Sequence, residues 1–180
     1  MIIGITGTLG AGKGTVVEYL KTKHFKHYSV RDFLNKEIQK RGLESNRDTM
    51  LAVANDLRAT KGPGYIAEQL VLEAQGNQGD AVIESIRSVG EAEHLKQHGA
   101  QLWAVDADLR TRYERIVKRM SETDKVSFEK FAQDEQAEFA NEDPSKPNLK
   151  KLIEVADVVF HNDGTPEDLF RQVENALAKA

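Results

Sequence analysis

A glycine-rich segment near the start of the chain, residues 7–15, constrains the fold most. It reads Gly-Thr-Leu-Gly-Ala-Gly-Lys-Gly-Thr and matches the pattern G-x-x-x-x-G-K, followed by a glycine and a threonine. An apolar run, residues 2–6, precedes it, and the helical spacing of Val16, Val17 and Leu20 follows it. A strand, this turn and a helix, in that order, form the context in which the pattern binds phosphate. The sequence therefore predicts a phosphate-binding loop between the first strand and the first helix.

The residue types in this segment predict a nucleotide as its ligand, and we expect ATP with Mg²⁺. Glycine lets the backbone direct successive N–H groups at phosphates, and the N-terminus of the next helix adds partial positive charge. We expect Lys13 to act in catalysis by bridging the β- and γ-phosphates, and the hydroxyl of Thr15, or in second place Thr8, to bind Mg²⁺. The alternative is a turn that only joins a strand to a helix. The nucleotide-binding residues expected here are Gly7, Gly10, Ala11, Gly12, Lys13, Gly14 and Thr15.

Short apolar segments predict strands, and the longer amphipathic segments between them predict helices. Most of the strand segments are continuously apolar, as in strands that are covered on both faces of a parallel sheet. Their alternation with helices predicts an α/β fold, a three-layer sandwich of the P-loop NTPase type with a five-stranded parallel sheet. The expected strands are residues 2–6, 27–29, 81–86, 101–105 and 157–161.

The length of the chain predicts one domain. Its 180 residues are the usual size of a compact domain, so we expect residues 1–180 to form a single P-loop domain. The least regular segments, residues 121–126 and 141–148, enclose a helical pattern over residues 128–139. We expect a small helical lid there, at about residues 120–148.

The composition excludes several classes of protein. Without cysteine the chain has no disulfide, thiol nucleophile or thiolate zinc site, and its five histidines show no close pairing that favours a metal site. A net charge of −4 argues against a general nucleic-acid binder. The sequence shows neither a signal peptide nor a stretch of about 20 apolar residues. We therefore expect a cytoplasmic protein with no membrane or nucleic-acid partner, and monomer and homodimer both stay open.

The Gly-Lys-Gly-Thr sequence of residues 12–15, the short chain and the distribution of arginines resemble the nucleoside monophosphate kinases of the adenylate kinase type and the related dephospho-coenzyme A kinases. The resemblance extends over nearly the whole chain, although only the glycine-rich loop is individually specific. It implies direct transfer of the γ-phosphate of ATP to a small phosphorylated acceptor, and we favour a nucleoside or deoxynucleoside monophosphate. It also implies that residues 31–78 form an acceptor-binding helical part.

By this resemblance, acceptor-binding residues follow the second strand. Arg31 and Asp32 lie where the family contacts its acceptor, and Arg58 is expected to reach the acceptor phosphate. Adenylate kinases usually have Thr-Gly-Asp here with an arginine three residues later, whereas this chain has Val-Arg-Asp and then an asparagine. Ser29 and Asp32 also have the spacing of a capping box, S-x-x-D, at the start of a helix, and the two roles are compatible.

Two charged residues end the third strand. Glu84 stands where the family more usually has an aspartate that acts on Mg²⁺, and we expect it to be a metal ligand. Arg87 is placed to neutralise charge on the transferring or the acceptor phosphate, so we expect it in catalysis and in acceptor binding. A structural pair between Glu84 and Arg87 is the alternative, because a buried acid needs a partner.

Arg112, Arg115 and Arg119 have the spacing i, i+3 and i+7, which places them on one face of a helix. Guanidinium groups aligned in this way repel one another unless an anion lies between them, and a transferring phosphoryl group is such an anion. The resemblance implies that the later arginines close over the phosphates, so Arg115 and Arg119 are catalytic candidates beside Arg87. With Glu114 nearby, an ordinary solvated helix is the alternative.

The segment around the last strand resembles the closing strand and turn of this family, especially in dephospho-coenzyme A kinases. That resemblance makes Asn162 and Gly164 candidates for the rim of the adenine site. The same turn can also be read as a helix start, because Thr165 precedes Pro166 and stands three residues before Asp168.

Two further functions stay open. A kinase of the dephospho-coenzyme A type would phosphorylate a hydroxyl group, and Asp32 could then accept the proton. A P-loop ATPase that is not a kinase would use nucleotide binding as a switch on a protein or RNA partner. The sequence contains no Asn-Lys-x-Asp motif, which argues against a GTPase.

Overall fold

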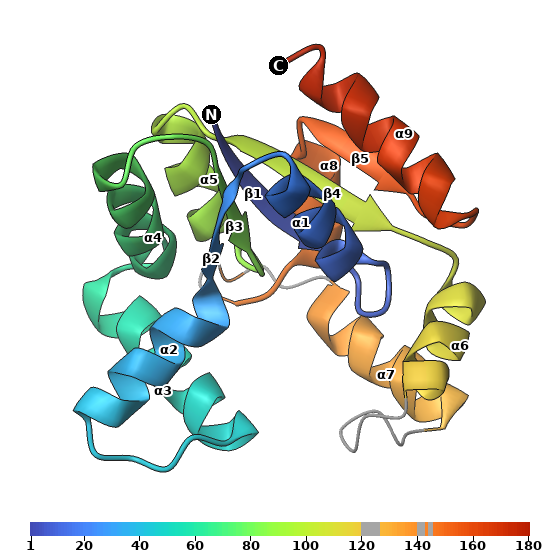
Figure 1. Cartoon of the computed structure of the whole chain (residues 1–180). Helices are drawn as coiled ribbons and strands as arrows, with labels where there is room; N and C mark the ends of the chain where they lie inside the picture. The colour runs from blue at the N-terminus through green and yellow to red at the C-terminus, as the bar shows by residue number, and fades with distance from the viewer. Residues whose placement is uncertain (120–126, 140–142, 144–145) are drawn as a thin grey trace.

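One parallel sheet forms the centre of the molecule (Figure 1). The computed structural model describes residues 1–119, 127–139, 143 and 146–180. Within these residues the strands lie in the order β2-β3-β1-β4-β5, and every neighbouring pair is parallel. This confirms the expected α/β fold with a five-stranded parallel sheet. The strands are β1 (Ile2–Gly7), β2 (Lys26–Ser29), β3 (Ala81–Glu84), β4 (Gln101–Asp106) and β5 (Val158–His161).

Helices cover both faces of the sheet. α1 and α9 pack on one face around a buried cluster that includes Trp103 and Phe160, and α4, α5 and α8 cover the other face. The pairs α2–α3 and α6–α7 stand on opposite sides below the edge where the strands end (Figure 1). The described helices are α1 (Lys13–Thr22), α2 (Val30–Lys40), α3 (Arg47–Lys61), α4 (Tyr65–Gly76), α5 (Val89–Gln97), α6 (Leu109–Arg119), α7 (Phe128–Phe139), α8 (Leu149–Val155) and α9 (Pro166–Leu177).

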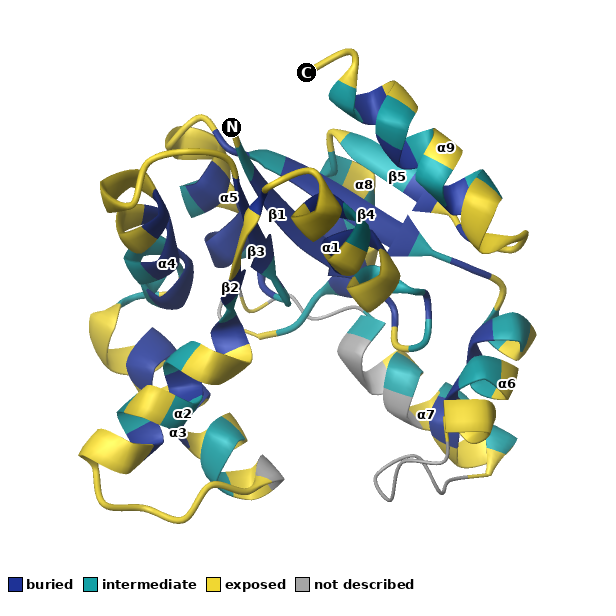
Figure 2. Ribbon diagram, viewed as in Figure 1, coloured by how far each residue is buried: buried dark blue, intermediate teal, exposed yellow. Residues whose placement is uncertain are grey.

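The central strand β1 is buried on both of its faces. Ile3 and Ile5 belong to the cluster under α1 and α9, whereas a Cβ on Gly4 would meet Leu95 of α5 on the other side. This double burial explains why the strand is continuously apolar instead of alternating. Figure 2 shows the buried residues gathered in the sheet and on the helix faces that touch it. None of the described helices is long and apolar enough to cross a membrane.

The start of α9 and the helix of the expected lid follow the sequence patterns. Thr165 accepts a hydrogen bond from the N–H of Asp168, whose carboxylate accepts one from the N–H of Thr165, so the helix-start reading of this turn is confirmed. The helix expected over residues 128–139 is α7. Residues 120–126, 140–142 and 144–145 of the expected lid lie outside the described residues.

Trp103 provides a test of the core. Its side chain is fully buried, and its ring meets that of Phe160 edge to face, with centroids 5.3 Å apart. Because a truncated side chain leaves a cavity here, we expect Trp103→Ala to lower the free energy of unfolding by about 3–5 kcal/mol. Urea denaturation followed by circular dichroism measures this loss. Leu51, which is 59% exposed, is the control, and Leu51→Ala should change the value by less than about 0.5 kcal/mol.

Candidate active site

The glycine-rich loop joins β1 to α1 at the carboxyl end of the central strand. Gly10 and Gly12 have positive φ angles of 80° and 102°, and added Cβ atoms would lie 2.7 Å from the carbonyl oxygen of Arg112 and 2.4 Å from Nδ2 of Asn162. Both positions therefore require glycine for conformation and for space. Gly12 is the N-cap of α1 and offers no side chain to the first N–H groups of the helix. A helix start of this kind is a common binding position for anions.

The ammonium group of Lys13 lies over this loop. Its Nζ donates hydrogen bonds of 2.8 Å to the carbonyl oxygens of Gly7 and Thr8. Phosphate oxygens carry negative charge and are therefore stronger hydrogen-bond acceptors for an ammonium group than neutral carbonyl oxygens are. A bound phosphate would thus draw Lys13 from these carbonyls. Gly14 and Thr15 follow in the first turn of α1 and are exposed.

Two strand ends hold the loop from its outer side. Asp106, at the end of β4, accepts a hydrogen bond of 2.8 Å from Oγ1 of Thr8. Asn162, which follows β5, is buried, and its Nδ2 donates to the carbonyl of Ala11 at 2.8 Å. The amide of Asn162 thus braces the phosphate loop, and its contact with adenine stays a prediction, as does that of Gly164, which is exposed in the turn before α9.

Glu84 lies at the end of β3, beside Ile5 of β1. Its Oε2 is 3.0 Å from Nε2 of His27 on β2, so the acid has a histidine partner where the sequence had suggested Arg87. The hydrogen bond from His27, with a smaller contribution from the charge of Lys13, lowers the pKa of the Glu84 carboxyl below its ordinary value. A carboxylate that stays ionised is a suitable oxygen ligand for Mg²⁺.

Arg58 and Glu91 form a buried ion pair behind the end of β3. Nη2 and Nε of Arg58 donate to Oε1 of Glu91 at 2.7 and 3.1 Å, and the side chains are 8% and 0% exposed. The other carboxylate oxygen accepts the N–H groups of Arg87 and Ser88 at 2.9 and 3.1 Å. The pair therefore fixes the backbone at Arg87, and direct contact between Arg58 and an acceptor stays a prediction.

The three arginines of α6 have different environments. Arg112 is buried, donates to the carbonyl of Leu9 at 3.3 Å and forms a two-bond ion pair with Glu135 of α7. The spacing of the arginines predicted an anion beside them, and for Arg112 that anion is the carboxylate of Glu135. Arg115 has a buried nitrogen, Nη1, with no hydrogen-bond partner among the described residues, and Arg119 is exposed in the last turn. A buried donor that lacks an acceptor is suited to a phosphate oxygen.

Arg31 and Asp32 lie in the first turn of α2 and are exposed. Ser29 is the N-cap of this helix and accepts a hydrogen bond of 3.3 Å from the N–H of Asp32. Of the expected capping box, the bond to Ser29 is therefore confirmed, whereas the return bond from the N–H of Ser29 to the carboxylate of Asp32 is not among the bonds of the described residues. Because the bond to Ser29 uses only the backbone of Asp32, the cap and a contact between its carboxylate and an acceptor are compatible.

Comparison with known sequences assigns the chain to a family. A family model described as an AAA domain matches residues 3–141. The UPF0200 protein MJ1399 of Methanocaldococcus jannaschii is 31% identical over 181 residues, which cover 98% of this chain and 89% of that protein. This chain is a UPF0200 protein with an AAA domain. MMP1282 of Methanococcus maripaludis, another UPF0200 protein, is 28% identical over 99% of this chain and 96% of its own.

Solved structures share the fold of this UPF0200 protein. TT1252 from Thermus thermophilus superposes with a TM-score of 0.67, at 21% identity, over 99% of this chain and 97% of that one. Shikimate kinase from Aquifex aeolicus has a TM-score of 0.55 at 16% identity over 99% and 97%, and gluconokinase from Sinorhizobium meliloti 0.56 at 14% over 98% and 91%. The protein therefore has a P-loop kinase-like fold.

The sequence analysis of this UPF0200 protein missed several residues of the site. Asp106 directly follows the apolar run of residues 102–105 in β4, and Glu91 stands three residues after Ser88 in a capping box, so local patterns could have identified both. His27 and Glu135 have no such local pattern. Their partners are 57 and 23 residues away, and only the packing of the elements brings them together.

The pair of His27 and Glu84 predicts a pKa change. Without the histidine hydrogen bond, we expect the lowered pKa of Glu84 to rise toward the ordinary value in His27→Ala. An NMR titration of the Glu84 carboxyl carbon measures the shift. His161→Ala replaces an exposed histidine on β5 and should leave that pKa unchanged; a shift of equal size in both variants would count against the pair.

The pair of Arg58 and Glu91 predicts a loss of stability. Arg58→Ala leaves a fully buried carboxylate without its guanidinium, so we expect the free energy of unfolding to fall by about 3–5 kcal/mol. Arg171→Ala removes a pair in which Arg171 is 74% exposed, and it should cost less than about 1 kcal/mol. Denaturant unfolding measures both values, and a similar small loss in each would refute the structural role of the buried pair.

Proposed function

We propose that this protein is an ATP-dependent phosphotransferase that moves the γ-phosphate of ATP to a small phosphorylated acceptor, most suitably a nucleoside or deoxynucleoside monophosphate. The observation that carries the proposal is Nη1 of Arg115, a buried cationic donor with no partner among the described residues, on the helix that packs against the phosphate loop. A Cβ on Gly10 would lie 3.1 Å from Ile116, the next residue of that helix. A phosphate-type loop and a guanidinium with one unsatisfied buried nitrogen on the helix beside it together fit a transferring phosphoryl group.

The residues of the loop, together with Glu84 of β3, fit a nucleotide with its metal ion. The N–H groups at the start of α1 and the ammonium of Lys13 supply donors for the phosphates. The hydroxyl of Thr15 and the ionised carboxylate of Glu84 are oxygen ligands of the type that Mg²⁺ prefers. When bound, the ion neutralises charge on the phosphoryl oxygens.

The proposed reaction is a direct, in-line transfer. A bond forms from an acceptor oxygen to the γ-phosphorus while the bond from that phosphorus to the oxygen it shares with the β-phosphate breaks, and ADP leaves. Lys13, Arg87, Arg115 and Arg119 stabilise the charge on the transferring group. The pair α6–α7 limits the access of water, which would otherwise hydrolyse ATP.

The acceptor is proposed to bind on the side of α2. Arg31 and Asp32 are exposed at the start of that helix, and Arg87 follows β3, the neighbour of β2 in the sheet. A phosphate acceptor needs no strong base. A hydroxyl acceptor of the dephospho-coenzyme A type remains the second proposal because the exposed carboxylate of Asp32 would then accept the hydroxyl proton.

The decisive experiment is an ADP-release assay with ATP and Mg²⁺ against ribo- and deoxynucleoside monophosphates and dephospho-coenzyme A, with the products identified by mass. One acceptor that yields stoichiometric phosphorylated product supports the proposal and identifies the acceptor class. If no small acceptor raises the rate while a protein or RNA does, the nucleotide acts as a switch and the phosphotransferase proposal is wrong.

Lys13 tests the site assignment. Because its ammonium is proposed to stabilise charge that develops during transfer, Lys13→Ala should lower kcat by about 10²–10³-fold with the fold retained in circular dichroism. Lys21→Ala, an exposed lysine of the same helix paired with Glu18, should leave kcat unchanged. A folded Lys13→Ala protein of full activity would overturn the assignment.

A further inference from the structure

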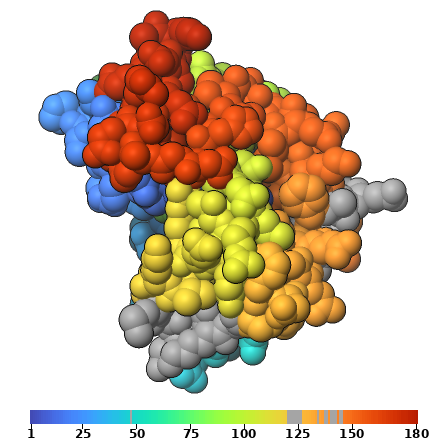
Figure 3. All heavy atoms as spheres, turned by 90° about the vertical axis from the view of Figure 1, so that its right-hand side faces the viewer, coloured from blue at the N-terminus to red at the C-terminus, as the bar shows by residue number. Residues whose placement is uncertain are grey.

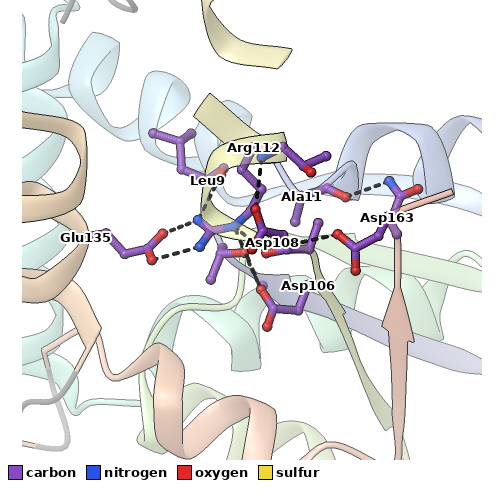
Figure 4. Close-up of polar contacts among 12 residues, drawn as sticks. Leu9, Ala11, Asp106, Asp108, Arg112, Glu135 and Asp163 are labelled. Carbon is purple, nitrogen blue, oxygen red and sulfur yellow. Dashed lines mark hydrogen bonds and ion pairs between the residues drawn. The ribbon is translucent and has the colours of Figure 1, made fainter. Parts of the chain in front are cut away.

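Arg112 joins three parts of the molecule, and the proposed reaction assigns it no role. It is 4% exposed, its Nε donates to the carbonyl of Ala107 at 2.7 Å, and its Nη1 donates to the carbonyl of Leu9 at 3.3 Å. The two terminal nitrogens also bond the two carboxylate oxygens of Glu135, with 2.8 Å between Nη2 and Oε1 (Figure 4). One side chain therefore connects the end of β4, the phosphate loop and α7.

We propose that Arg112 is a positioning residue that ties α7 to the phosphate loop, so that Glu135 sets the affinity of the loop for phosphate. The inference deepens the proposed function and rests on its nucleotide site. Arg112 acts on the loop through a backbone carbonyl and has no direct contact with the nucleotide in this proposal.

The direction of the peptide groups explains how such a contact acts on affinity. In a trans peptide the carbonyl oxygen and the amide hydrogen point in opposite directions. When Arg112 holds the carbonyl of Leu9 on the outer side of the loop, the N–H of Gly10 must point to the other side. The bond from Asn162 to the carbonyl of Ala11 orients the N–H of Gly12 in the same manner.

The packing of α7 against α6 holds Glu135 where its carboxylate can bind Arg112. Phe131 is 3% exposed and stands one helical turn before Glu135, on the same face of α7. The ring of Phe131 lies 5.7 Å from that of Tyr113 and 5.9 Å from the guanidinium carbon of Arg112. Figure 3 shows α6 in yellow beside α7 in orange. Apolar packing thus holds the carboxylate in place at the arginine.

A second carboxylate makes the position of Arg112 sensitive to Glu135. Nε of Arg112 is 4.0 Å from Oδ1 of Asp106, the same atom that accepts the hydroxyl of Thr8. Removing the charge of Glu135 would leave a buried cation without that partner, and the carboxylate of Asp106 would then attract it. Without the charge of Glu135, we expect Arg112 to shift toward Asp106 and to weaken its own bond to Leu9 as well as the bond of Asp106 to Thr8.

The test compares the affinities of ATP and adenosine in variants of the intact chain. Glu135→Gln keeps the volume of the side chain and removes its charge, and Glu114→Gln makes the same change in the exposed pair of Glu114 and Arg110. Isothermal titration calorimetry should show that Glu135→Gln lowers the affinity for ATP by at least about tenfold and the affinity for adenosine by less than about twofold. Glu114→Gln should leave both affinities unchanged.

Two further measurements separate positioning from a general loss of structure. In the ATP-saturated protein, hydrogen exchange at the Gly10 amide should be faster in Glu135→Gln than in the wild type, while exchange in β1 is the same in both. Arg112→Lys should lower the affinity for ATP to a similar degree. In the double variant of Arg112→Lys and Glu135→Gln, the fold-loss of ATP affinity should be smaller than the product of the two single losses, because both changes remove the same contact.

The outcomes distinguish this inference from the proposed function. An unchanged ATP affinity in Glu135→Gln, or an equal loss for ATP and adenosine, overturns the inference while the phosphotransferase proposal stands. ATP binding that depends on Glu135, in a protein that phosphorylates no acceptor, supports the inference and overturns the transfer reaction. A wild-type protein that binds no ATP overturns both.

Discussion

In the phosphate loop, the peptides after Leu9 and after Ala11 can present their N–H groups to a phosphate only when their carbonyl groups point the other way. Those outward carbonyls need partners, and the partners come from elements far along the chain. Arg112 of α6 binds the carbonyl of Leu9, and Asn162 after β5 binds that of Ala11. The order of strands in the sheet places these elements beside the loop. Much of the architecture around β4 and β5 thus serves to hold one short turn.

Buried arginines are used here to position backbone groups. Arg58 neutralises Glu91, whose second carboxylate oxygen accepts two N–H groups after β3. Arg112 neutralises Glu135 and also donates to two backbone carbonyls. A guanidinium has five donors in a planar fork, so it can satisfy a carboxylate and a backbone carbonyl at the same time. This arrangement leaves Arg115 as the α6 arginine that carries an unpaired buried donor among the described residues.

The sequence predicted the elements of this fold better than the roles of its charged residues. The apolar strands, the loop and the start of α9 follow from local patterns, and they appear close to where the sequence placed them. The largest difference is in β3, which was expected to reach residue 86 but ends at Glu84, where the next residue, Ser85, has a positive φ of 75°. Arg58 and Arg112 were harder to interpret because an arginine that binds phosphate and one that binds a carboxylate have the same appearance in a sequence. Which anion each meets depends on an acidic residue from another helix.

By itself, the sequence determined a phosphate loop between a buried strand and a helix, set in a parallel α/β fold, because glycine conformation, hydrophobic periodicity and helix capping act over a few residues. The tertiary structure alone decided the order of the strands and the partners of Glu84, Arg58 and Arg112. Those partners lie 57, 33 and 23 residues away in the chain. Contacts at such separations exist only after the helices have packed on the sheet, so no local pattern encodes them.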